Sequence, residues 1–188
     1  MNSPIETIRE LFERRGSNQY GGEAVNQLQH ALQAAALART SKANPSLIVA
    51  ALLHDMGHFI DEEPSSGECE SNLDDKHEYK ANRWLRQHFG RDIADPIRLH
   101  VLAKRYLCTV DSSYEDQLSP TSLKSYHDQG GPMTEDEQAN FESEPMWEEA
   151  LQLRKWDDQA KDPSRQTPSL EAFLPLVKSC LRNSESRD

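Results

Sequence analysis

Two adjacent residues, His54 and Asp55, stand out because they interrupt an apolar run that otherwise predicts a buried helix. A charged carboxylate beside an imidazole is costly in such surroundings unless a partner, such as a bound metal ion, compensates it. Neighbouring helix positions point about 100° apart, so both side chains reach one metal ion only at a distorted turn or a helix end. Gly57 predicts such an end. A carboxylate has two oxygens and can bridge two metal ions, whereas an imidazole binds one.

Further candidate ligands stand on other predicted helices, and this is how helical bundles assemble metal sites from facing elements. They are His30, His77, His100 and Asp157. Together with the adjacent pair, they make an imidazole-rich set that suits iron, zinc or manganese rather than calcium or magnesium. The sequence therefore predicts a site for two metal ions.

Two cationic side chains share helix faces with predicted ligands. Lys104 follows His100 by four residues. Arg154 precedes Asp157 by three. Residues spaced by three or four project from the same side of a helix. A lysine and an arginine beside metal ions suit an anionic substrate group, although most such charges only solvate a helix surface.

The elements that must position these residues are helices, because helical periodicity dominates and strand signals are nearly absent. We expect one all-α domain over residues 1–188. The expected helical segments are 5–12, 26–38, 44–57, 77–89, 93–107, 119–124, 146–161 and 170–182, and another helix is expected to begin at Thr134. Residues 61–75 hold seven acidic residues and no lysine or arginine, which predicts a solvated loop.

Several helix boundaries carry local signals. Asn44 is a candidate N-cap followed by Pro45 at the first helical position, and Thr134 with Glu137 resembles a capping box. Asp92 is a candidate cap for the segment that begins near residue 93. Pro175 predicts a kink in the last helix.

Composition excludes several classes of protein. The formal net charge of −11 gives no basic footprint for nucleic acid or for a membrane surface, although metal ions and a few cations can still attract a small anionic substrate. Three widely spaced cysteines without a CxxC pair fit a reducing cytoplasm. We see no signal peptide and no apolar run of membrane-spanning length, and therefore expect a cytoplasmic protein. The sequence gives no indication of its oligomeric state.

The order His…His-Asp…His…His…Asp is the signature of the HD-domain superfamily, and the chain resembles one group within it more closely. These are the mixed-valent diiron oxygenases that cleave the carbon–phosphorus bond of 2-amino-1-hydroxyethylphosphonate, with myo-inositol oxygenase a more distant relative. The resemblance covers a motif-bearing core of about residues 20–161 and implies a single HD-domain helical bundle. Its motifs are YGGEAVNQLQH (20–30), AALLHDMGH (50–58), HVLAKRYL (100–107), YHDQGGPM (126–133) and LRKWD (153–157).

The resemblance implies two iron ions, Fe(II) and Fe(III), with O2 as co-substrate. One iron is held by His30, His54, Asp55 and Asp157. The other is held by His77 and His100, with Asp55 bridging the two. The segment around His77 is the least similar of the ligand segments.

The resemblance also implies roles around the substrate. Tyr20 binds iron at rest and withdraws when substrate arrives, and Glu23 pairs with the substrate's amino group. Lys104 is expected to act in both substrate binding and catalysis. Tyr20 and Asp55 are expected to act in catalysis. Ser122 and Gln129 match positions that line the phosphonate pocket of these enzymes. His58 follows His54 by four residues and could bind the same group as Lys104 and Arg154.

The expected reaction is O2-dependent cleavage of a 1-hydroxyphosphonate. A primary amine on the substrate is favoured, because an ammonium donates hydrogen bonds to Glu23 whereas a trimethylammonium prefers aromatic faces. The trimethylammonium analogue, which would give glycine betaine, and hydroxymethylphosphonate stay open. A metal-dependent phosphohydrolase is the alternative enzyme, and a regulatory HD module ranks last.

Overall fold

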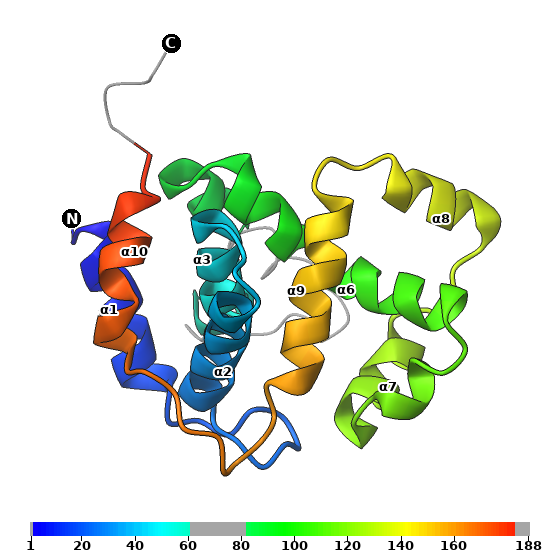
Figure 1. Ribbon diagram of the computed structural model, residues 1–188, viewed down its shortest axis with the longest axis horizontal. Helices are drawn as coiled ribbons and strands as arrows, with labels where there is room; N and C mark the ends of the chain where they lie inside the picture. The colour runs from blue at the N-terminus through cyan, green and yellow to red at the C-terminus, as the bar shows by residue number, and fades with distance from the viewer. Residues whose placement is uncertain (1, 61–81, 183–188) are drawn as a thin grey trace, which may run out of the picture.

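The computed structural model describes residues 2–60 and 82–182 as a helical bundle (Figure 1). Within this part of the chain there is no strand, only an isolated bridge between Gln19 and Asn26. Residues 82–88 are also helical. The named helices are α1 (Pro4–Arg15), α2 (Gln27–Thr40), α3 (Pro45–Leu53), α4 (Gly57–Ile60), α6 (Arg91–Val110), η2 (Glu115–Gln117), α7 (Pro120–Asp128), α8 (Glu135–Glu142), α9 (Trp147–Gln159), η3 (Leu170–Ala172) and α10 (Leu174–Ser179).

Four helices form the centre of the bundle. Helices α3 and α9 each contact the other and both α2 and α6 (Figure 1). Helix α2 is buried around much of its circumference, where Ala34, Ala35 and Ala38 are fully covered. Such small side chains let neighbouring helices approach closely. Helices α1 and α10 cover one side of this centre, and α7 and α8 lie on the other side.

Predicted N-caps are confirmed at two helices, α3 and α8. The Asn44 side chain accepts from the Leu47 amide, and Pro45 occupies the first turn of α3. Thr134 and Glu137 form a reciprocal capping box at α8. These caps satisfy amides that a helix N-terminus leaves without a partner.

Three predicted boundaries were wrong. Helix α3 ends at Leu53 rather than near Gly57, which instead begins α4. The cap of α6 is Gly90, because the Asp92 carboxylate accepts a hydrogen bond from Ser46 instead. Pro175 lies in the first turn of α10, where its missing N–H costs nothing, so it does not kink the helix.

Some predictions fall elsewhere in the chain. The acidic segment 61–75 and His77 lie outside the described residues, as does the start of the segment predicted from residue 77. None of the described helices combines the length and the apolar character needed to cross a membrane.

Candidate metal centre and substrate cavity

Four predicted ligands converge at the centre of the bundle from three different stretches of chain. His30 lies on α2, His54 and Asp55 form the turn after α3, and Asp157 lies on α9. The Nε2 atoms of His30 and His54 are 3.0 Å apart. Asp55 Oδ2 is 3.5 Å from the first of these nitrogens and 3.3 Å from the second. Asp157 Oδ1 approaches His30 Nε2 to 3.3 Å.

Backbone carbonyls fix the orientation of three imidazoles. In each case Nδ1–H donates to a main-chain oxygen. The acceptors are Ala160 for His30 at 3.0 Å, Ala51 for His54 at 2.9 Å, and Ile97 for His100 at 2.6 Å. Nε2 is therefore the nitrogen that is available as a metal ligand, as metal-binding histidines require. Two such lone pairs 3.0 Å apart repel each other unless a cation lies between them.

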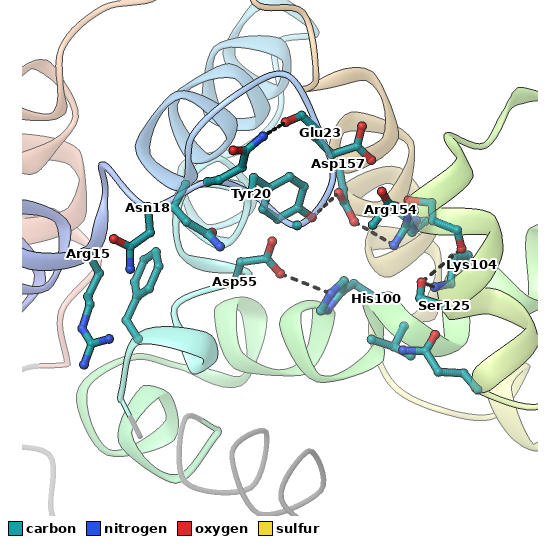
Figure 2. A pocket seen from close by; sticks show the side chains of 18 residues that line it. Arg15, Asn18, Tyr20, Glu23, Asp55, His100, Lys104, Ser125, Arg154 and Asp157 are labelled. Atoms are coloured by element: carbon teal, nitrogen blue, oxygen red, sulfur yellow. Dashed lines mark hydrogen bonds and ion pairs between the residues drawn. The ribbon is translucent and has the colours of Figure 1, made fainter. Parts of the chain in front are cut away.

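The two oxygens of Asp55 face different histidines. Oδ2 faces the pair formed by His30 and His54, whereas Oδ1 lies 3.8 Å from Nε2 of His100 on α6 (Figure 2). This arrangement suits a carboxylate that serves two metal ions. Among the described residues, His30, His54 and Asp55 alone place three potential ligand atoms within 4.8 Å of one another.

Burial and the charges in this cluster shift the pKa values of its members in different directions. Burial would lower the pKa of His54, but Asp55 and Asp157 outweigh burial and raise that pKa well above its usual value. Burial would raise the pKa of Asp157, but Arg154 and the imidazoles hold it well below its usual range. Burial lowers the pKa of His100 to about 4, so this ring is neutral near pH 7. The cluster therefore attracts a cation.

Tyr20 covers the cluster from the loop before α2. Its ring stacks on His30 with centroids 3.8 Å apart, and its hydroxyl donates to Asp157 Oδ1 over 3.4 Å (Figure 2). The loop is held closed, because the Tyr20 amide donates to the Val25 carbonyl at 3.1 Å. Gly21 has a φ of +52°, a conformation that favours glycine. The predicted metal-facing position of Tyr20 is thus consistent with the geometry.

A cavity of about 480 Å³ opens beside the cluster (Figure 2). Asp55, His100 and Asp157 contribute to its lining, as does Lys104. The Lys104 ammonium donates to Ser125 Oγ at 2.5 Å. Burial, followed by repulsion from Arg154, lowers the pKa of Lys104 to about 8. The cavity therefore places a cation within the same space as the predicted metal ligands.

The predicted pocket residues differ in what they contact. Ser122 and Arg154 are buried and line the cavity, and Gln129 lines it with an exposed side chain. His58 belongs to α4, but its side chain lies outside what the structure describes. Glu23 lines the cavity and accepts a hydrogen bond from Ser119.

Arg154 forms ion pairs with two carboxylates on its own helix. Its Nη1 lies 2.8 Å from Asp157 Oδ2, and its Nε donates to Asp158 Oδ2 at 2.8 Å. A second contact to Asp158 makes that pair bidentate. Arg154 therefore orients a predicted ligand, in addition to lining the cavity.

Sequence reasoning missed several members of the site, among them Ser119, Ser125, Asp158 and Lys161. Lys161 Nζ donates to Ser122 Oγ at 2.7 Å and lies 3.4 Å from Glu23 Oε1. The spacing from Asp157 to Lys161 is four residues, which is the same signal that pointed to Lys104 and could have pointed here.

Comparison with known proteins identifies a family and two enzymes to which this chain is similar. Residues 28–123 match the HD domain. Over 180 residues the chain is 44% identical to the hydroxymethylphosphonate dioxygenase of Gimesia maris, covering 96% of this chain and 89% of that protein. Over 174 residues it is 38% identical to the glycine-betaine-forming 1-hydroxy-2-(trimethylamino)ethyl phosphonate dioxygenase of Leisingera caerulea, covering 93% and 88% respectively.

Proposed function

The chain belongs to the HD-domain family and, within it, to the oxygenases that cleave the carbon–phosphorus bond of phosphonates; on this premise we propose that it uses two iron ions and O2 to convert a small 1-hydroxyphosphonate into a carboxylate and phosphate. The family and the all-α HD fold predicted from the motifs are confirmed, and the chain is an enzyme. The mixed-valent iron pair and the identity of the substrate belong to the proposal, as does the division of the chain into one HD domain with its core at about residues 20–161.

The donor atoms fit the proposed iron ions. His30, His54 and a carboxylate make a set of two imidazoles and one carboxylate, which is typical of iron in oxygenases. Zinc would suit the same donors but has no redox chemistry, whereas the relatives are dioxygenases, which use O2. His100, His77 and the second oxygen of Asp55 would hold the other iron. When bound, the two ions would supply the redox chemistry of O2 activation.

The protein's own residues would bind and orient the substrate. The Lys104 ammonium would pair with the phosphonate, next to the metal ligands His100 and Asp55. Arg154 would keep Asp157 ionised and correctly turned, because its guanidinium is bonded to that carboxylate at 2.8 Å. Tyr20 would leave its position over His30 to admit the substrate hydroxyl, with Gly21 and Gly22 giving the loop freedom to move. The phosphonate pocket would be completed by His58, Ser122 and Gln129.

The observation that carries the proposal is a single cavity lined both by Lys104 and by three predicted metal ligands, Asp55, His100 and Asp157. A small phosphonate can therefore reach a cation and the metal ions at once. Iron-loaded protein should release phosphate from a 1-hydroxyphosphonate in air and stop under strict anaerobiosis. Undiminished release without O2 would contradict the proposal, as would preference for a phosphate monoester.

A further inference from the structure

Glu23 is the one carboxylate among the described cavity-lining residues that is not a predicted metal ligand. A cationic substituent on a substrate would therefore have Glu23 as its natural partner. The protein already supplies a cation there. Lys161 Nζ lies 3.4 Å from Glu23 Oε1, and the two side chains are only 10% and 11% exposed.

The Lys161 ammonium is fully engaged in this position. It donates to Ser122 Oγ at 2.7 Å and to Ser119 Oγ at 3.3 Å, and it forms an ion pair with Glu23. Ser119 Oγ in turn donates to the same Glu23 oxygen. Asp158 Oδ1 lies 3.7 Å from the ammonium and adds to its attraction. Two serines and two carboxylates thus hold Lys161 beside Glu23 and Ser122, which line the cavity.

The charged groups around Glu23 are paired without a ligand. Lys161 lies against Glu23 and Asp158, and Arg154 pairs with Asp157 and Asp158. A primary ammonium brought to Glu23 would meet Lys161 within a few ångströms, in surroundings where like charges are costly. A trimethylammonium would need aromatic faces, but the cavity is lined by only two described aromatic rings, Tyr20 and Phe59. Tyr20 is already stacked on His30.

We infer that Lys161 is a specificity-determining residue: its ammonium neutralises Glu23, so the site favours a 1-hydroxyphosphonate that carries no cationic substituent, namely hydroxymethylphosphonate. The inference rests on the proposed function and narrows its substrate. It reverses the preference for a primary amine that Glu23 alone suggests.

The first test compares three substrates on the wild-type, iron-loaded protein: hydroxymethylphosphonate, 2-amino-1-hydroxyethylphosphonate and its trimethylammonium analogue. Phosphate release in air should give the highest kcat/KM for hydroxymethylphosphonate, by about tenfold or more over either cationic compound. Calorimetric titration without O2 should give the same order of dissociation constants. A wild-type preference for either cationic compound would overturn the inference.

The second test removes the internal cation. Lys161→Gln should lower the affinity for hydroxymethylphosphonate and raise that for the primary amine, so that the ratio between them shifts by about tenfold or more. Lys155→Gln is the matched control, because Lys155 is exposed on α9. Lys161→Arg keeps the charge and should keep the wild-type order. Damage to the fold would lower all affinities alike, whereas the inference requires the ratio to change.

The outcomes separate this inference from the function on which it rests. Absence of phosphate release from all three compounds would contradict the proposed function, while the anaerobic titrations would still decide the role of Lys161. An unchanged ratio in Lys161→Gln would contradict the inference and leave the proposed C–P cleavage intact.

Discussion

At the scale of single residues, the account depends on Asp55, whose two oxygens face different imidazoles. One lies 3.3 Å from His54 Nε2 and the other 3.8 Å from His100 Nε2. A histidine or a lysine at this position could serve only one ion or none. The chemistry of the centre is therefore most sensitive to this side chain.

Asp55→Ala should remove both irons, because one carboxylate serves both. Elemental analysis after anaerobic iron loading should find about two irons per chain in the wild type and almost none in the variant. Asp95→Ala is the control, since Asp95 is equally buried but pairs with Arg86 at 2.6 Å, outside the cluster. It should lose stability and keep its irons. Normal iron content in Asp55→Ala would rule out the bridging role.

Lys104 should set the alkaline limit of activity. Burial and Arg154 lower its pKa to about 8, so the ammonium that pairs with the phosphonate is lost as the pH rises through that value. The value of kcat/KM, which reports the free enzyme, should fall above pH 8 and approach a loss of about tenfold per pH unit. Lys104→Arg should move this fall to higher pH, because arginine stays charged. An unmoved profile would assign the titration to another group.

At the scale of elements, the end of α3 determines where the ligands point. Because α3 stops at Leu53, His54 and Asp55 lie in a turn, and the two side chains converge on one place instead of pointing in different directions. The His54 ring supports this turn by donating to the Ala51 carbonyl. In the same way, the loop before α2 determines where the Tyr20 side chain points.

Gly21→Ala should impair activity through this loop. Alanine at a φ of +52° costs about 1–2 kcal/mol, and its Cβ would lie 3.2 Å from Thr121 Cγ2. Gly131→Ala imposes a similar strain at a φ of +64° with no atom within 4 Å of the new Cβ. Both variants should lower the melting temperature similarly, but only Gly21→Ala should lower kcat/KM several-fold. Equal kinetics would mean that the loop's conformation does not matter to turnover.

The sequence predicted those features of the fold that are local, because Asn44, Thr134 and the apolar periodicity give the helices. The order of histidines and aspartates pointed to residues that the structure brings together at the centre, and their role as metal ligands stays a prediction. The partner of Glu23 could not be predicted, because Lys161 is 138 residues away in the chain and only the folded loop brings the two together. The early end of α3 was missed because Gly57 gave a stronger local signal than the turn that precedes it.

At the scale of the whole molecule, the centre joins helices that are distant in the sequence. Ligands from α2, the turn after α3, α6 and α9 share one place in the core (Figure 1). Metal binding at such a site contributes directly to the stability of the fold. Without metal, the same imidazoles and carboxylates stabilise one another only when the imidazoles are protonated.

The metal-free protein should therefore lose stability as the pH rises from 6.5 through the raised pKa values of His30 and His54. The folded-state pKa values of His54 and His30 are raised, so their stabilising contribution is complete below 6.5 and is lost as the pH rises through those higher values. His100, with a pKa of about 4, acts below this window, and Lys104, with a pKa of about 8, acts above that value. Each kcal/mol lost should lower the melting temperature by about 2–4 °C.

Iron-loaded protein provides the comparison for this stability measurement. The metal ions keep the imidazoles deprotonated throughout, so its melting temperature should stay level over the same pH window. Parallel falls in the loaded and metal-free forms would show that groups outside the cluster govern the pH dependence.

The central claim is that O2, rather than water alone, supplies oxygen when the carbon–phosphorus bond is cleaved. The most direct measurement is turnover of hydroxymethylphosphonate by iron-loaded protein under isotopically labelled O2 in ordinary water, with mass analysis of both products. The account predicts O2 consumption equal to phosphate release, and label from O2 in the products. Products free of that label, with phosphate released in the absence of O2, would contradict it and identify the protein as a hydrolase.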